Sequence, residues 1–366
     1  MDKVIKASDP EALYQHIIFN KFVTKFIYLY IKDDNLIFDE NKFESLYVNL
    51  EEYIQGTAKF HYFANLYGFD HEEQEIVVGD DITIRKIVDT QKVMASVYNQ
   101  LDQLLMNNNY DFQQINPSTS RIETYDIHYN LDSKREKFQH AIDVLNLFTE
   151  GPVQLSYVKC ELPLFYPAEI SSAVEVIKPR GGSGWSLSKM SKDESQKFTT
   201  FFEKLSNVRD RHKLGFAIRR FNYGKISRDR DDKIVDLIIS LESLFGDGSN
   251  TDLNYKLALR VALIHGKDYH HRKKLRKIFK LLYDARSHVV HGSEADKTIR
   301  KIEQDCKDWM SNLMMISRNS IIAYLNLMGE TNTVNDIIIQ IDESIFDDVL
   351  KANIRTKARL EFEKEF

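Results

Sequence analysis

The stretch LYDARSHVVHG, residues 282–292, is the most informative in this chain because it closes a strongly helical pattern. Apolar side chains recur every three or four residues in the segment that leads into it, at Leu275, Ile278, Phe279 and Leu282. This spacing puts them on one face of an α-helix. Gly292 then favours the left-handed backbone conformation in which many helices end. The stretch therefore predicts a long amphipathic helix that stops at residues 291–292.

Similar patterns flank this helix on both sides. Residues 232–245 carry a wide apolar stripe, as a helix buried in a bundle requires. A shorter apolar segment, 256–264, is followed by His265 and Gly266, and one long helix is predicted over 296–327. We therefore predict an all-α helical bundle over residues 196–330, followed by a C-terminal helical tail over 331–366. Its mixed and charged part, residues 343–366, is expected to be peripheral.

The first 177 residues mix strand and helix patterns. Short alternating segments bounded by turn residues predict strands at 75–78, 82–87, 121–130 and 153–162. Helical spacing predicts one helix over 90–106 and a second that opens with a capping box at Ser133 and Glu136. Because these elements lack a regular strand–helix–strand rhythm, we expect an α+β domain over residues 1–177.

Residues 178–195, KPRGGSGWSLSKMSKDES, predict a linker or exposed loop, since glycine, serine and lysine dominate them. The glycines do not match a phosphate-binding loop, because the next lysine comes too late and the G-K-[ST] ending is missing. A hinge or a loop that caps a ligand is the interpretation that remains.

Basic charge is concentrated on the predicted helical part. The whole chain has a formal net charge of −5. Residues 1–200 hold 20 basic and 30 acidic side chains, whereas residues 201–320 hold 25 basic and 16 acidic ones. This asymmetry favours a polyanionic partner for the helical part, although solvated helix faces that happen to be basic would give the same counts.

The composition disfavours secreted and membrane proteins. Two cysteines far apart in sequence, Cys160 and Cys306, do not make a disulfide framework and predict buried thiols of a reducing compartment. No segment approaches the roughly 18 apolar residues that a membrane helix needs, and the start of the chain lacks a basic region before an apolar core. We expect a soluble, cytoplasmic protein without membrane contacts.

The quoted stretch also carries chemistry, because Arg286 and His291 are five residues apart, with Ser287 and His288 between them. A guanidinium is always charged and forks onto phosphate oxygens, whereas an imidazole gains and loses a proton near neutral pH. The pair suits a phosphodiester, with the arginine holding the phosphate and the histidine moving a proton. By itself the spacing is common, and such residues are more often a solvated arginine and a capping histidine.

The surrounding sequence sharpens this interpretation. Residues 198–327 resemble the ApeA-like branch of the HEPN superfamily, whose R-x4-H signature is matched by Arg286-Ser287 and His291-Gly292 at its two ends. The resemblance covers roughly the C-terminal third of the chain. It implies a helical domain that forms homodimers. In many members of the superfamily, the dimer is a metal-independent ribonuclease whose active site forms from both copies of the motif.

Helix geometry favours such a shared site. Five residues rotate by about 500°, so Arg286 and His291 point roughly 140° apart on a regular helix. Either the helix breaks at residues 291–292, or the arginine of one copy works with the histidine of the other. Both alternatives favour a site at a helix end and at a dimer seam.

The expected reaction is cleavage of RNA by its own 2′-hydroxyl, with no metal or other cofactor. His291 is expected to transfer the proton and Arg286 to stabilise the charge on the phosphorane. Ser287, four residues before the histidine, would orient the imidazole or contact the phosphate. His288 completes the candidate catalytic set. The products would be a 2′,3′-cyclic phosphate and a 5′-hydroxyl.

Further residues complete the predicted site. Glu242, in the apolar segment 232–245, either faces the motif arginine or lies on an exposed face. We assign supporting roles to Glu242, Tyr283 and Gly292. Basic residues precede the motif on the expected exposed face of the helix, at Arg272, Lys273, Lys274, Arg276 and Lys277. They predict phosphate contacts that lead RNA to the active cleft, unless they form only a solvated helix face.

Two other chemistries are disfavoured. The histidines near the motif have no cysteine neighbour and no H-E-x-x-H spacing, so we expect no metal site. Ser287 lacks the G-x-S-x-G elbow of serine hydrolases. The resemblance implies a role in bacterial antiviral defence or toxin-like RNA degradation, with an N-terminal domain that senses a trigger or restrains the nuclease. The alternative is a non-catalytic HEPN module that binds RNA or nucleotides or mediates dimerisation.

Overall fold

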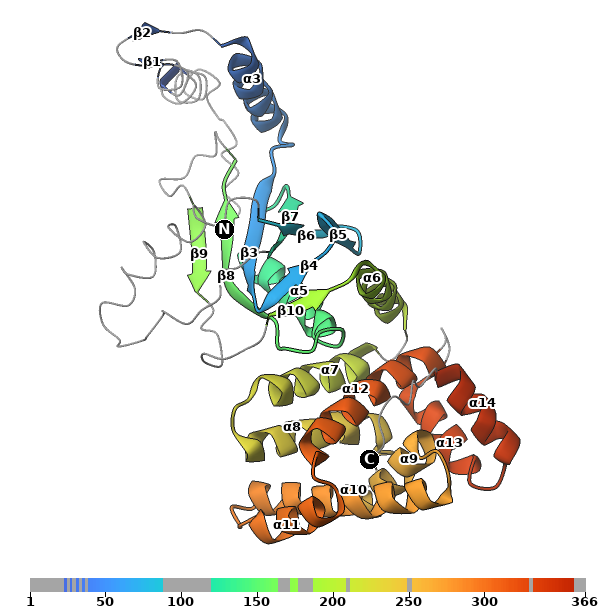
Figure 1. Cartoon of the computed structure of the whole chain (residues 1–366). Coiled ribbons are helices and arrows are strands. Elements are labelled where there is room, and N and C mark those ends of the chain that lie inside the picture. The colour runs from blue at the N-terminus through green and yellow to red at the C-terminus, as the bar shows by residue number, and fades with distance from the viewer. Residues whose placement is uncertain are drawn as a thin grey trace.

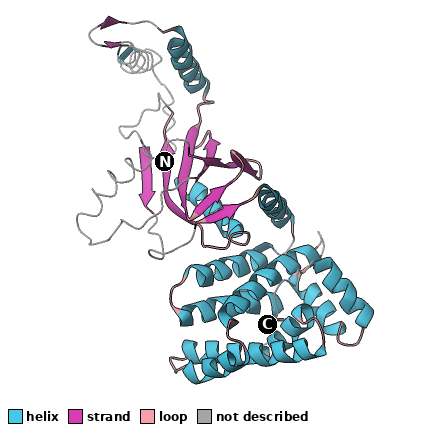
Figure 2. Cartoon of the chain, viewed as in Figure 1, coloured by secondary structure: helices cyan, strands magenta, loops and turns pink. Residues whose placement is uncertain are grey.

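The structure is a computed structural model of the chain of 366 residues. It describes residues 39–87, 120–163, 172–176, 187–208, 211–248, 252–328 and 332–358, with a few positions between 23 and 36. An antiparallel sheet region comes first and a largely helical part follows (Figures 1 and 2), which confirms the predicted order of an α+β part and a helical part. The helix predicted over 90–106 lies outside the described residues.

A six-stranded antiparallel sheet forms the centre of the first part. In spatial order its strands are β5 (Glu75–Val78), β6 (Ile82–Lys86), β7 (Ser120–Asp126), β3 (Phe60–Tyr67), β8 (Gln154–Glu161) and β9 (Ser172–Val176). The four segments predicted as strands coincide with β5, β6, β7 and β8. The even-numbered side chains of β3, from Phe60 to Leu66, are buried in the core, as the two-residue period of a strand requires.

Smaller elements flank this sheet. A short hairpin of β1 (Ile31–Lys32) and β2 (Asn35–Leu36) and the helix α3 (Glu40–Gln55) come before β3. After β3, the strand β4 (Phe69–His71) pairs in parallel with β10 (Ser188–Met190). The helix α6 (Lys192–Asn207) follows β10 and packs against β5 and α5 (Leu131–Leu145).

The linker predicted over 178–195 was therefore wrong for residues 188–195. The Ser188 hydroxyl oxygen accepts the backbone N–H of Gly151 at 2.7 Å, which holds β10 in place. Ser191 and Glu194 form a capping box at the start of α6. A serine-rich composition is typical of a loop, whereas these hydroxyl groups satisfy backbone groups where a strand passes into a helix.

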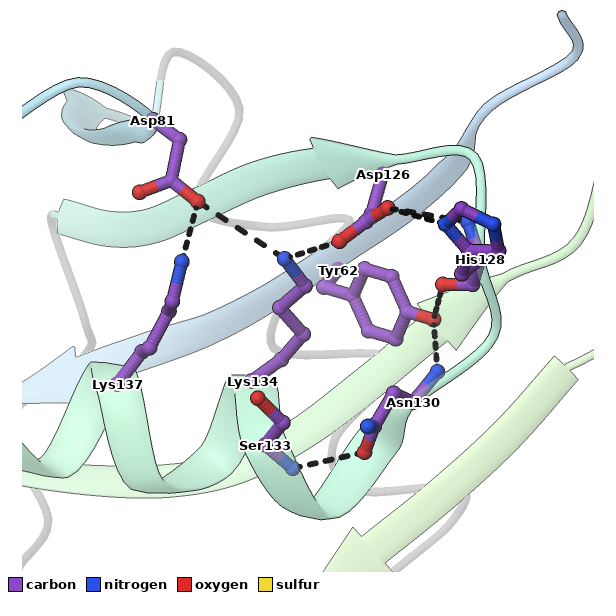
Figure 3. Close-up of polar contacts among 8 residues, drawn as sticks. All are labelled: Tyr62, Asp81, Asp126, His128, Asn130, Ser133, Lys134 and Lys137. Carbon is purple, nitrogen blue, oxygen red and sulfur yellow. Dashed lines mark hydrogen bonds and ion pairs between the residues drawn. The ribbon is translucent and has the colours of Figure 1, made fainter.

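The helix α5 packs against β3 and β8. Figure 3 shows the contacts at its start: the side chain of Asn130 accepts the backbone N–H of Ser133 at 3.0 Å, and the Tyr62 hydroxyl accepts the backbone N–H of Asn130 at 2.8 Å. Asn130 is thus the N-cap of α5. The capping box predicted at Ser133 and Glu136 was wrong, because the asparagine starts the helix earlier.

The second part is a bundle of α-helices. Its elements are α7 (Arg211–Ile226), α8 (Arg230–Phe245), α9 (Leu253–His265), α10 (Tyr269–Val290), α11 (Asp296–Asp305), α12 (Trp309–Leu327), α13 (Val334–Glu343) and α14 (Asp348–Ala358). Four of them, α7, α9, α10 and α12, pack against α8 (Figure 1). The apolar stripe of α8 is buried. The stripe predicted over 232–245 is thus a central element of the bundle.

The pattern over 296–327 corresponds to two helices and not to one. The backbone is extended at Cys306, with φ −154° and ψ 107°, so α11 ends there and α12 begins at Trp309. The Nδ2 of Asn312 donates to the Cys306 sulfur at 3.2 Å, and both Cys306 and Trp309 are buried. A helical period continues in the sequence across the break, which is why periodicity did not reveal it.

The C-terminal helices belong to the bundle, because α13 packs against α9 and α12, and α14 packs against α9, α12 and α13. The expectation that 343–366 is peripheral was therefore wrong for α14, the helix that the structure describes within this range. Ile337, Ile338 and Ile341 of α13 are buried. The guanidinium of Arg260, in α9, donates to both carboxylate oxygens of Asp342 at 2.8 and 2.7 Å. The ion pair of Asp342 with a buried arginine therefore helps to hold this end of the chain in the bundle.

Two cations join the sheet part to the bundle at the C-terminal end of α5. The buried ammonium of Lys225, in α7, donates to the main-chain oxygens of Asn146 and Thr149 at 2.7 and 2.5 Å. Arg318 of α12 donates to the main-chain oxygen of Leu147. Cations suit the last carbonyl groups of a helix, which carry the negative end of its dipole. Charge-assisted hydrogen bonds therefore tie the two parts together.

Cys160 and Cys306 are buried thiols, as predicted, and neither forms a disulfide. Within the described ranges, every helix is too short or too polar to cross a membrane.

Candidate functional site

The motif lies at the C-terminal end of α10. Gly292 adopts a φ of +69°, and its backbone N–H donates to the Val289 carbonyl at 3.0 Å. The next N–H, of Ser293, donates to the His288 carbonyl at 2.8 Å. These two bonds make a Schellman motif, in which His291 is the C-cap residue. The helix end predicted at residues 291–292 is confirmed.

Arg286 points from α10 toward α8. Its Nη2 donates to the Oε2 of Glu242 at 3.2 Å, and the two side chains are 23% and 21% exposed. The Tyr283 ring lies beside the guanidinium, with its centroid 5.8 Å from the arginine Cζ. Burial raises the pKa of Glu242 above its usual range, although Arg286 and a hydrogen bond from Tyr283 oppose the shift. Glu242 therefore faces the motif arginine and does not lie on an exposed face, the other alternative that the sequence allowed.

The guanidinium retains donors beyond this ion pair. An arginine has five N–H groups, and one of them meets Glu242. The Nε of Arg286 is buried without a hydrogen-bond partner among the described residues. A buried donor without a partner costs about 1–3 kcal/mol. An acceptor oxygen that reached this edge of the guanidinium would therefore stabilise the site.

The two histidines differ in exposure. The imidazole of His291 is exposed and makes no hydrogen bond or ion pair within the described part of the chain. His288 is half-buried, and its Nδ1 is buried without a partner among the same residues. Ser287 is half-buried, and its main-chain oxygen accepts the His291 N–H at 3.1 Å. His291 is thus the motif side chain most open to a substrate.

Arg286 and His291 do not converge within one chain. The helix α10 continues through Val290, so the divergence of roughly 140° expected from helix geometry applies. The guanidinium faces α8, whereas the imidazole faces solvent. The helix ends at His291 itself, too late to bring both side chains onto one face.

The five basic residues predicted to contact RNA do not share one surface. Three of them are exposed, Lys273, Arg276 and Lys277. The other two, Arg272 and Lys274, are partly buried. The ammonium of Lys277 is ion-paired with Asp305 of α11 at 2.6 Å. The guanidinium of Arg276 lies 4.8 Å from the ring centroid of Tyr255, in α9. The neighbouring helices α9 and α11 therefore already contact two of these five side chains.

Lys280 ends the same basic segment but is not among the five residues predicted to contact RNA. It is exposed, seven residues after Lys273 and eleven before His291. Seven and eleven residues are close to two and three helical turns, so these three side chains lie on the same side of α10. We call Lys273, Lys280 and His291 the outer row of α10. The spacing that defines it was visible in the sequence.

The arrangement offers proton transfer from an imidazole and stabilisation of an anion by a guanidinium. The described residues contain no group of three or more His, Cys, Asp or Glu side chains arranged to hold a metal ion.

Compared with known proteins, the chain matches no family model, no curated protein and no solved structure. The resemblance to HEPN domains therefore stays a prediction that rests on the motif and on residues 198–327.

Proposed function

We propose that the helical part of this protein is an endoribonuclease of the HEPN type that cleaves RNA without a metal ion. One observation carries the proposal: the last turns of a single helix combine an arginine anchored by Glu242 with an exposed histidine, His291. The sequence resemblance over 198–327 supplies the substrate class. The net positive charge of residues 201–320 suits a polyanion.

In the proposed reaction the 2′-hydroxyl of RNA attacks the adjacent phosphorus, and the bond from phosphorus to the 5′-oxygen breaks. His291 accepts the 2′ proton or donates one to the leaving oxygen. Arg286 stabilises the negative charge that builds on the phosphorane oxygens. The products are a 2′,3′-cyclic phosphate and a 5′-hydroxyl. DNA is not cleaved, because it lacks the attacking hydroxyl.

Glu242 and Tyr283 act as positioning residues in this proposal. A guanidinium on a flexible stem has many conformations, and an ion pair with a half-buried carboxylate restricts them. The Tyr283 ring lies beside the same guanidinium, with its centroid 5.8 Å from the Cζ of Arg286. Ser287, one turn before His291, is close enough in sequence to orient the imidazole or contact the phosphate.

The complete site is proposed to include a second copy of the chain. Arg286 and His291 of one copy point apart, so a partner must supply the missing member of each pair. A two-fold axis near the end of α10 would bring two arginines and two histidines together. Val290, the residue before His291, is an apolar side chain that is 51% exposed, which supports an interface at this helix end.

The sheet part is proposed to sense a trigger or to restrain the nuclease. Lys225 and Arg318 support this role, because both bundle side chains bond the C-terminal end of α5. A movement of α5 would therefore pull on α7 and α12 through these hydrogen bonds.

RNA cleavage by the purified full-length protein in excess EDTA tests the proposal. Wild type is expected to cleave RNA but not DNA. Arg286→Ala and His291→Ala should each lose about 100-fold or more in rate, with unchanged circular dichroism. His270→Ala changes an exposed histidine at the other end of α10 and should keep full activity.

Activity that disappears in EDTA and returns with Mg²⁺ or Zn²⁺ overturns the mechanism. If the wild-type protein binds RNA and does not cleave it, the alternative of a non-catalytic module that binds RNA is supported instead.

A further inference from the structure

The helix α7 combines a strongly basic sequence with an exposed aromatic face. Its residues RHKLGFAIRRFNYGKI include five lysines and arginines and no acidic side chain. One side of the helix is buried and packs against α8, through residues such as Leu214, Ala217, Ile218 and Phe221. The opposite side presents His212, Phe216, Arg219 and Tyr223 at intervals of three and four residues. We call these four residues the outer face of α7.

Two large rings lie on this face. Phe216 is 36% exposed and Tyr223 is 43% exposed. Because the two are seven residues apart, they lie on one side of the helix, separated by about 10 Å along its axis. Exposed apolar groups that gather on one face commonly mark a surface that binds a partner. The rings therefore indicate a partner that offers flat apolar groups.

Arginines lie between the two rings. The Cζ of Arg220 is 5.4 Å from the Phe216 centroid and 5.9 Å from the Tyr223 centroid. Arg220 is ion-paired with Asp236 of α8 at 2.9 Å, so its charge is balanced within the protein. Arg219 is exposed. Its charge opposes the rise that burial causes in the pKa of Asp143, in α5, and that carboxyl group is itself buried. The exposed charge on this face is therefore positive and suits an anionic partner.

We propose that the outer face of α7 binds single-stranded nucleic acid, with bases stacked on Phe216 and Tyr223 and a phosphate on Arg219. Aromatic rings joined to basic groups are what unpaired bases and their backbone require, and stacking accepts any base. An acidic protein segment would meet the charge but would leave both rings without a stacking partner.

The assignment of this nucleic acid as RNA rests on the proposed ribonuclease activity. The surface is separate from the motif, since α8 lies between α7 and α10 (Figure 1). In that setting α7 holds a second stretch of the RNA chain, while the outer row of α10 leads another stretch to His291.

Binding of a short fluorescent single-stranded RNA, followed by anisotropy, tests this inference. All variants are made in the full-length His291→Ala chain, so that the RNA is not cleaved. Phe216→Ala and Tyr223→Ala should each weaken binding about 5- to 100-fold, the loss expected for one stacked base. Tyr223→Phe keeps the ring and should bind like its parent. Arg219→Gln should lower the slope of log affinity against log salt by about one.

Phe346→Ala serves as the matched control, because Phe346 is a 92% exposed ring between α13 and α14. It should leave the affinity unchanged. Fully duplex RNA of the same length should bind more weakly than the single strand and should not respond to loss of the rings, since its bases are already stacked. Circular dichroism of each variant checks that α7 is still folded.

Unchanged affinity in both alanine variants overturns the inference. Poly-glutamate that binds as tightly as RNA and responds to the same variants assigns the face to an acidic protein and overturns it too. A chain that binds RNA through α7 without ever cleaving it upholds this inference and ends the ribonuclease proposal. A chain that cleaves RNA, but whose affinity for RNA is the same in the α7 variants, overturns this inference and upholds the ribonuclease proposal.

Discussion

The guanidinium of Arg286 is bonded to the carboxylate of Glu242, with 3.2 Å between Nη2 and Oε2, across the contact between α10 and α8. The two residues are 44 positions apart in sequence. The ion pair is about one-fifth exposed, so water screens it only in part. It holds the charged end of the motif arginine in one direction before any substrate arrives.

Glu242→Gln should lower the rate of RNA cleavage about tenfold at saturating RNA, because the amide holds the guanidinium less firmly than a carboxylate does. Glu242→Ala should lower it further and reduce the free energy of unfolding by about 1–3 kcal/mol, since a half-buried guanidinium loses its partner. Single-turnover kinetics and urea unfolding measure the two effects. Glu203→Gln changes an exposed glutamate of α6 and is the control. Equal rates for Glu242→Gln and Glu203→Gln would show that Arg286 needs no anchor.

Mixing Arg286→Ala protein with His291→Ala protein should restore part of the cleavage activity. Each mixed dimer contains one site with an intact arginine and an intact histidine, so random exchange gives about a quarter of the wild-type activity. Native mass spectrometry verifies that mixed dimers form. The shared site is refuted if mixed dimers are present and inactive, or if a fully active monomer is seen by light scattering.

The double variant Lys273→Ala/Lys280→Ala should weaken RNA binding and flatten its salt dependence by about one to two units in log–log form. The loss should be uniform across RNA sequences, because phosphate contacts carry no base information. Cleavage of fully bound RNA in a single turnover should change little. Lys189→Ala/Lys197→Ala removes two exposed lysines from the region of β10 and α6 as a control. The same salt slope in both variants would mean that the outer row of α10 is only a solvated surface.

Stability should fall in acid because of His265. This residue is fully buried in α9, with its Nε2 2.8 Å from the hydroxyl oxygen of Ser320, and burial lowers its pKa to about 3. An unfolded histidine has a pKa near 6.5. Between these values the unfolded chain binds more protons, so the free energy of unfolding falls as the pH drops below about 6.5.

Urea unfolding of wild type and His265→Gln at pH 7 and pH 4.5 measures this contribution. The loss of stability between the two pH values should be about 2–3 kcal/mol larger for wild type than for the variant. Parallel losses in the two proteins would mean that His265 is protonated as easily in the folded state as in the unfolded one.

Much of the bundle could be predicted because its signals are local. The apolar stripes of α8 and α10 follow from the helical period, and the end of α10 follows from the backbone freedom of Gly292. The errors arose where a distant contact overrode a local pattern. The extended backbone at Cys306 interrupts a continuous helical period, and Asp342 is drawn into the bundle by Arg260.

The candidate site divides in the same way. The residues of the motif, their spacing and their divergence around α10 are properties of a single helix, so they follow from the order of the amino acids. Three features became visible only in the folded chain: the ion pair of Arg286 with Glu242, the pairing of Lys277 with Asp305, and the exposure of Phe216 and Tyr223. Each of these depends on which side of a helix faces its neighbours. That choice is made by packing between segments far apart in the chain, which no local periodicity encodes.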